Sequence, residues 1–261
     1  MVHIGPETFQ YVIIDHVQNQ VKVLAEFELE QANNTTELIK AIEALPESKK
    51  QFKYSFNIVK ISFDSFDYTF IPADLYVEED RHDYSKFLSF AGTKEILVNN
   101  IPSVEIKNVV AIEPALKDAL QRIFQNPKIY NQASPFLEGI QKSITREDDL
   151  VCFIDFQPSN FQFGIIKDFR LEFYNTFEYF NADEFNYYLL NIIESLALRV
   201  EQTPIVLSGK VSKTDEVYLR IEKYFERIRF IDSEHLTKYS GKFEEVLPHT
   251  FFTLFSLDLC E

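Results

Sequence analysis

One stretch of the chain, residues 150–209, constrains the fold more strongly than any other. Three apolar runs typical of strands come first, joined by short polar connections: LVCFIDF (150–156), FQFGII (161–166) and FRLEFYNTF (169–177). An amphipathic helix is predicted at 181–198, and the run PIVLSGK then predicts a buried strand that ends in a turn. A β-β-β-α-β unit of this order can enclose its own hydrophobic core, so the stretch indicates an α/β domain.

The first half of the chain shows the same order of elements. Three strands are predicted between residues 2 and 29, and a helix then begins at Asn34 or Thr35 and stops before Pro46. After further strands, three more helices are predicted: 73–90, 114–124 and 135–144. We interpret the similarity of the two halves as a repeat of topology and not of sequence.

A charged run, TREDD at 145–149, separates the two halves. Boundaries between domains fall in exposed polar segments, so this run predicts a boundary. We therefore expect a first half at residues 1–147 and a second half at residues 148–261.

The composition favours protein partners over nucleic acid. The 261 residues carry 41 acidic and 26 basic side chains, and the net charge of −15 repels a polyanion because each phosphate contact needs Lys or Arg. No segment approaches the roughly 20 apolar residues of a membrane span, and the N-terminus lacks the pattern of a signal peptide. We therefore expect a cytoplasmic protein that does not insert into membranes.

The sequence contains no recognisable catalytic motif or metal site. Neither Cys152 nor Cys260 has a cysteine or histidine at ligand spacing on its own element, and no two histidines are paired at metal spacing. We interpret His3 as a solvated histidine and the acidic run at 78–85 as a solvated face. The patterns GxSxG, HExxH, GxGxxG and the P-loop are absent, so we assign no metal ligand and no catalytic residue, and we expect a non-catalytic protein before an enzyme.

Four segments in combination resemble a bacterial family of unknown function with an actin-like ATPase fold: YTFIPADLY (68–76), FRLEFYNTF (169–177), PIVLSGKV (204–211) and HTFFTLFSLDLCE (249–261). The resemblance covers essentially the whole chain and extends distantly to the pilus-assembly protein PilM and the division protein FtsA. It implies an α/β protein of two ribonuclease H-like halves, each a mixed sheet flanked by helices, that face each other across a nucleotide cleft.

In actin-like families, two hairpin turns bind phosphate, each with an Asp and with backbone amides of Gly or Ser. At the first hairpin of this sequence, His3 stands where the family has Asp, Gly5 is the only glycine and Pro6 removes a backbone donor. At the second hairpin Asp155 is retained, but other residues replace the glycines: Phe156, Gln157 and Pro158. At the adenosine turn, Lys210 takes the place of the second of two glycines.

Two main hypotheses follow from the resemblance. In the first, the protein is a scaffold or interaction protein, a pseudo-ATPase with a degenerate nucleotide site and no cofactor. In the second, it binds ATP with Mg and is a weak ATPase, and Asp155, Ser208, Gly209 and Lys210 line the cleft. An Asp such as Asp155, at a strand end before a turn that contains Pro, is more often a turn former than a metal ligand, and Ser208-Gly209 is what any strand-to-helix connection needs. A homodimer that uses an exposed Phe and Tyr face is a third possibility.

The C-terminal segment HTFFTLFSLDLC predicts one helix that begins near Pro248. Its apolar stripe would contain Phe251, Leu254, Phe255 and Leu259, while Phe252 lies off the stripe. We expect this stripe to dock against a sheet of the fold.

Overall fold

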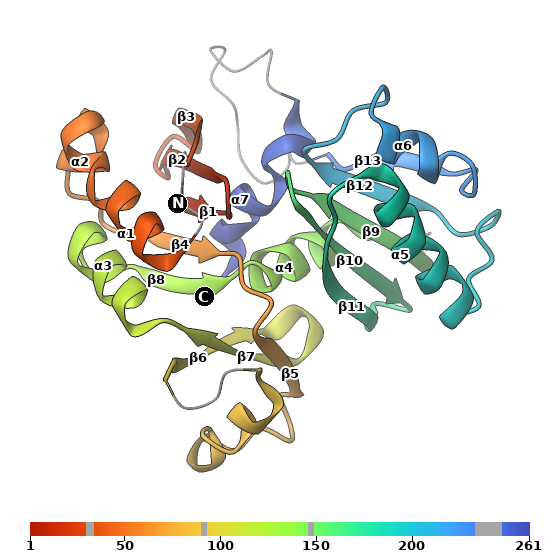
Figure 1. The fold of residues 1–261 in the computed structure, drawn as a ribbon, viewed down its shortest axis with the longest axis horizontal. Helices are drawn as coiled ribbons and strands as arrows, with labels where there is room; N and C mark the ends of the chain where they lie inside the picture. Colours follow the sequence, from red (N-terminus) through yellow and green to blue (C-terminus); the bar gives the residue numbers. More distant parts are fainter. Residues whose placement is uncertain (30–33, 90–92, 146–148, 233–246) are drawn as a thin grey trace. The chain divides into compact units, whose positions relative to one another are not determined.

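The structure is a computed structural model that describes residues 1–29, 34–89, 93–145, 149–232 and 247–261. Its contacts divide the chain into two units (Figure 1): unit 1 is Met1–Glu138 with Leu254–Glu261, and unit 2 is Gly139–Thr253. The division falls inside helix α4 (Ala133–Ser143), which continues across it. Residues 146–148, around the boundary expected from the charged run, lie outside the described residues.

Unit 2 contains one five-stranded sheet in the order β11-β10-β9-β12-β13. The strands are β9 (Leu150–Phe156), β10 (Asn160–Lys167), β11 (Arg170–Glu178), β12 (Ile205–Gly209) and β13 (Ile228–Phe230). The first three strands are antiparallel neighbours, whereas β12 runs parallel to β9 and β13 runs parallel to β12. Helix α5 (Ala182–Ser195) follows β11, and the short helix α6 (Glu216–Ile221) follows β12. The expected β-β-β-α-β order and the mixed sheet are confirmed.

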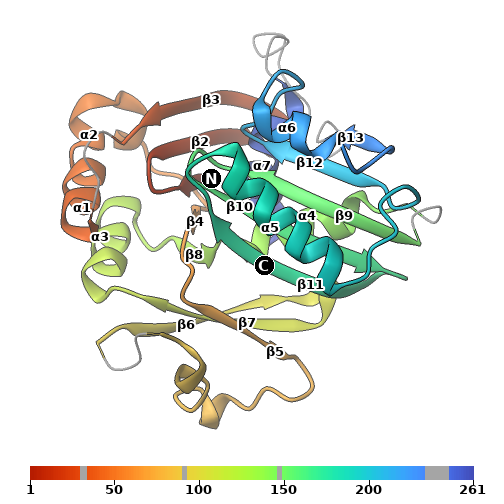
Figure 2. The same cartoon turned by 45° about the vertical axis from the view of Figure 1, so that its right-hand side comes forward.

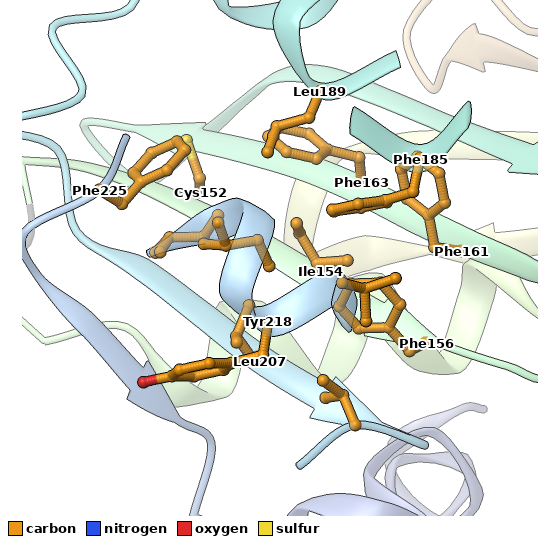
Figure 3. Packing of buried hydrophobic residues seen from close by; sticks show 14 of the residues in the cluster. Cys152, Ile154, Phe156, Phe161, Phe163, Phe185, Leu189, Leu207, Tyr218 and Phe225 are labelled. Atoms are coloured by element: carbon orange, nitrogen blue, oxygen red, sulfur yellow. The ribbon is translucent and has the colours of Figure 1, made fainter. Parts of the chain in front are cut away.

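Alternation along the strands of unit 2 separates an apolar face from a polar row. Ile154, Phe156 and Phe161 point to the face that packs against Phe185 and Leu189 of α5 (Figure 3), and all five side chains are fully buried. Residues one position along each strand point to the opposite face of the sheet. This places three polar side chains there in neighbouring positions: Asp155, Gln162 and Ser208.

Unit 1 contains a second five-stranded sheet in the corresponding order β3-β2-β1-β4-β8. Its strands are β1 (Val2–Ile4), β2 (Thr8–Asp15), β3 (Gln20–Glu28), β4 (Lys60–Phe63) and β8 (Lys128–Asn131). Its helices are α1 (Thr35–Glu43), α2 (Leu45–Ser48) and α3 (Pro114–Phe124). The side chain of Asn34 caps α1 as Asn181 caps α5, because each accepts a backbone N–H of the first turn. The two units therefore share one topology.

The repeat extends from topology into sequence. FQYVII at residues 9–14 of β2 corresponds to FQFGII at residues 161–166 of β10, and each strand shifts register between its two consecutive isoleucines. The first phenylalanines make matching contacts, since Phe9 stacks on Phe27 with ring centroids 4.9 Å apart and Phe161 stacks on Phe177 at 5.1 Å. The interpretation of the halves as a repeat of topology alone was therefore incomplete.

A three-stranded sheet, β5-β7-β6, is inserted in unit 1 (Figure 2): β5 (Tyr68–Pro72), β6 (Glu95–Ile101) and β7 (Ile106–Ile112). The helix predicted at 73–90 was wrong, because the described part of that segment contains only the 3-10 turns η2 (Glu78–Asp80) and η3 (Tyr84–Phe87). Tyr76 and Tyr84 stack with centroids 5.3 Å apart and pack against this sheet, and the Tyr84 hydroxyl accepts the backbone N–H of Val77. These tertiary contacts outweigh a weak helical periodicity.

The C-terminal segment is docked, but as three short turns and not as one helix: η6 (Pro248–Phe251), α7 (Phe252–Ser256) and η7 (Leu257–Leu259). Leu254 and Phe255 are buried as expected. Phe252, predicted to lie off the stripe, is fully buried, whereas Phe251 is only half-buried. The breaks between turns rotate the side chains away from the positions of a continuous helix. Within the described residues, no helix has both the length and the apolar character needed to cross a membrane.

Candidate functional site

The retained aspartate of the second hairpin, Asp155, lies near the end of β9 and is fully buried. Asp155 faces Ser208 across the parallel pair of β9 and β12, and the Ser208 hydroxyl donates to Asp155 Oδ1 at 2.7 Å. Asp155 Oδ2 accepts the side-chain amides of Gln157 at 3.1 Å and Gln162 at 3.3 Å. The structure thus brings Asp155 and Ser208 together, and side chains of the same unit bond both carboxylate oxygens.

Gly209 has a packing role at the end of β12. Its φ of +79° lies in the left-handed region, and a Cβ atom there would lie 2.1 Å from the carbonyl oxygen of Phe156. The backbone N–H of the next residue, Lys210, donates to the same carbonyl at 2.7 Å. Gly209 therefore allows β12 to approach the backbone at the end of β9, which accounts for this glycine without a phosphate.

Lys210 extends from this turn toward the C-terminal segment. Its ammonium nitrogen lies 5.5 Å from the ring centroid of Phe251, within the range of a cation–π contact. All four residues expected to line a nucleotide cleft lie at the ends of β9 and β12: Asp155, Ser208 and Gly209, and Lys210 through its backbone N–H. The side chain of Lys210 contacts the ring of Phe251 in η6.

His249, on η6, is a neighbour of this site that no sequence pattern indicated. Its Nε2 lies 3.0 Å from the carbonyl oxygen of Val211, and its ring centroid lies 4.4 Å from that of Phe230. Burial lowers the pKa of His249, against the opposing effects of the Val211 hydrogen bond and the charge of Asp155. Because η6 is more than thirty positions from Val211 in the sequence, spacing alone could not associate them.

The first hairpin, in unit 1, repeats the geometry of the second with different chemistry. His3 faces Ser62 across the parallel pair of β1 and β4, and its Nδ1 lies 2.8 Å from the Ser62 hydroxyl. Its Nε2 lies 3.5 Å from a carboxylate oxygen of Asp64. The interpretation of His3 as a solvated histidine was wrong, because the residue is fully buried on the polar face of the sheet.

The two hairpins correspond position by position across their sheets. His3 faces Gln10 on β2 as Asp155 faces Gln162 on β10, and both glutamines are buried. In unit 1 the amide of Gln10 donates to Glu26 Oε2 at 2.7 Å instead of to the hairpin residue. The shared FQ dipeptide at the start of β2 and β10 is the sequence signal that could have identified both glutamines.

Comparison with solved structures supports the fold. A Bacteroides thetaiotaomicron protein with an actin-like ATPase fold and unknown function has a TM-score of 0.82 at 16% identity, over 100% of this chain and 95% of that chain. The PilM-PilN type IV pilus biogenesis complex has a TM-score of 0.64 at 11% identity, over 99% and 96%. The ethanolamine utilization protein EutJ from Carboxydothermus hydrogenoformans has a TM-score of 0.55 at 7% identity, over 100% and 88%.

These identities are low enough that the similarities concern the fold alone, and the fold is the actin-like ATPase fold. Among curated protein sequences, none matches the chain. One family model matches most of the sequence, residues 1–228, and its description is protein of unknown function (DUF3822). By this match over residues 1–228, the chain belongs to the family of proteins of unknown function DUF3822.

Proposed function

We propose that the protein is a non-catalytic scaffold or interaction protein of the cytoplasm, built on an actin-like fold whose nucleotide site has degenerated. The observation that carries this proposal is the bonding of Asp155. Its Oδ2 accepts hydrogen bonds from Gln157 and Gln162 of the hairpin and its Oδ1 accepts one from Ser208 of β12, so both oxygens bond the protein itself. A carboxylate that holds a metal ion, directly or through water, must direct at least one oxygen to that shell.

The residues of both hairpins fit ATP with Mg poorly. His3 replaces an acidic residue in the first hairpin, and its Nδ1 is engaged by the Ser62 hydroxyl. In the second hairpin, the backbone N–H of Gln157 donates to the carbonyl of Asn160 at 2.8 Å and is not available to a phosphate. Gly209 is required by packing against Phe156. We therefore derive no catalytic step through ATP.

The proposal assigns a protein as the partner. With a net charge of −15, the chain is poorly suited to bind nucleic acid. A protein of similar fold, PilM, forms a complex with PilN in a solved structure, so a fold of this kind is compatible with partner binding. The similarity to PilM is one of fold alone, so PilN is not proposed as the partner of this chain.

A specific observation favours the alternative, in which the protein binds nucleotide and is a weak ATPase. The Ser208 hydroxyl lies 2.7 Å from Asp155 Oδ1 at the ends of two adjacent parallel strands, and Gly209 follows Ser208 in the sequence. Ligands of open α/β sheets bind at the carboxyl ends of such strands. In this alternative Asp155 would hold Mg and Lys210 would meet a phosphate.

Thermal unfolding with and without millimolar ATP and Mg separates the two functions. A degenerate site predicts an unchanged melting temperature, because a ligand stabilises a protein only by binding its folded state. A functioning site with ATP at 100 times its Kd would add about 2.7 kcal/mol. A clear upward shift that disappears in Asp155→Ala, and persists in the exposed-site control Leu219→Ala, would overturn the scaffold proposal.

A further inference from the structure

An apolar groove of about 570 Å³ lies in unit 1, and its lining includes neither His3 nor Gly5 of the first hairpin. Its walls come from the end of β2, from η1 (Lys50–Lys53) and from the irregular segment 55–59 before β4. Tyr11, Phe52 and Phe124 form an aromatic wall, with centroids of Tyr11 and Phe52 5.0 Å apart and those of Phe52 and Phe124 5.9 Å apart. The volume falls in the range of ligand-binding clefts, which are lined mainly by apolar side chains.

Three large apolar side chains at this groove are exposed to solvent. The exposed fractions are 41% for Phe56, 62% for Ile58 and 98% for Val17. A single exposed apolar residue needs no explanation, but several around one apolar groove are typical of an interaction site. Tyr11 and Phe124 of the aromatic wall are themselves buried, so these three exposed side chains provide the apolar surface that a partner at the groove would cover.

The segment beside the groove also offers free backbone groups. Among the backbone hydrogen bonds of the described residues, none involves residues 55–58, whereas the Val59 carbonyl, next in sequence, accepts the N–H of Lys128. Unpaired backbone N–H and C=O groups beside a groove are groups that the backbone of a bound peptide can bond. These groups favour a peptide, with its own backbone donors and acceptors, over a compact apolar small molecule as the occupant.

The charges at the groove favour a cationic occupant. Asp15 and Asp258 line it with partly exposed carboxylates. The Asp15 carboxylate is paired with Lys22 at 3.6 Å. Among the described residues, the side-chain partner of Asp258 is instead His16 Nε2, at 3.8 Å, so Asp258 is the carboxylate that a basic side chain of a partner would meet.

The lining Lys60 is already engaged, because its ammonium donates to the carbonyls of Asp258 at 2.9 Å and Cys260 at 2.5 Å. Burial lowers the pKa of the Met1 amino group to about 5, so this group adds little positive charge at neutral pH.

We propose that this groove binds an extended peptide segment of a protein partner, with apolar side chains at alternate positions and a basic side chain that meets Asp258. The apolar side chains contact the aromatic wall and Ile58, and the peptide backbone bonds residues 55–58. The inference rests on the proposed function as an interaction protein and names the surface that the function uses.

A phage-displayed library of random seven-residue peptides, selected on the full chain, tests the proposal. Selected peptides should share alternating apolar residues with Lys or Arg, and a synthetic copy of the most enriched one is then titrated by fluorescence anisotropy. Ile58→Asp should weaken its binding by about tenfold or more, because an apolar anchor is lost. Asp258→Asn should weaken it about three- to tenfold and reduce its salt dependence.

Leu219→Asp is the matched control, since Leu219 is 45% exposed on α6 of unit 2, and it should leave the affinity unchanged. Ile58 and Asp258 are exposed enough that both variants should keep the wild-type melting temperature. The proposal that this groove binds a peptide would be overturned by any of three outcomes: no enriched consensus, an acidic consensus, or peptide binding that is unchanged by Ile58→Asp. Those outcomes leave the scaffold proposal intact, whereas stabilisation by ATP would overturn the scaffold proposal and not the groove.

Discussion

Gly209→Ala should destabilise unit 2 far more than a typical glycine substitution. Alanine at φ +79° costs about 1–2 kcal/mol in the left-handed region. Its Cβ would also lie 2.1 Å from the Phe156 carbonyl oxygen and 2.6 Å from the Phe156 nitrogen, both backbone atoms that cannot rotate away. Separating the strands adds about 1–3 kcal/mol, as in other overpacked sites. We therefore expect a total loss of about 2–5 kcal/mol in the free energy of unfolding.

Gly5→Ala, in the corresponding hairpin of unit 1, is the control. A Cβ atom at Gly5 would meet the Thr8 hydroxyl at 3.0 Å and an Asp64 carboxylate oxygen at 3.6 Å, and side-chain atoms can shift. The φ of Gly5 is not positive, so its substitution should cost less than about 1 kcal/mol.

Urea unfolding followed by far-ultraviolet circular dichroism measures both losses, since the chain has no tryptophan for fluorescence. Hydrogen exchange then locates the loss, which should appear in β9 and β12 for Gly209→Ala. Equal and small losses for the two variants would refute the close approach of β12 to the backbone of Phe156.

Two further predictions concern the C-terminal segment. Burial lowers the pKa of His249 from 6.5. The stability of the fold with a neutral His249 is therefore fully present above that pH, and part of the free energy of unfolding is lost as the pH falls toward the folded-state pKa. His249→Gln keeps a donor for the Val211 carbonyl, so in urea titrations it should lose less of its free energy of unfolding than wild type between about pH 7 and pH 5. The same decrease in the free energy of unfolding with pH for both proteins would contradict this role of His249. Phe255→Ala should lower the free energy of unfolding by about 3–5 kcal/mol because Phe255 is buried, and the half-buried Phe251→Ala should cost clearly less. Similar urea midpoints for these two variants would instead favour the single helical stripe.

Local signals in the sequence were sufficient for most elements. The helix predicted at 114–124 has those bounds in the structure, because Pro114 fits the first helical turn and the apolar residues repeat at helical spacing. Helix α5 and the three strands before it also formed as expected, since each pattern lies within one element. The retained Asp155 could be identified from the resemblance, and its place near the end of a strand followed from the apolar run.

The sequence by itself thus determined the order of most strands and helices, the α/β class and the candidate residues at the ends of β9 and β12. Only the tertiary structure decided what those residues contact. The Ser208 hydroxyl reaches Asp155 across 53 positions of the chain, and His3 is buried against Ser62 across 59 positions. The segment 73–90 has no regular helix among its described residues because it packs on the inserted sheet. Periodicity and capping act within a few residues, whereas burial and hydrogen bonding depend on partners that only folding brings together.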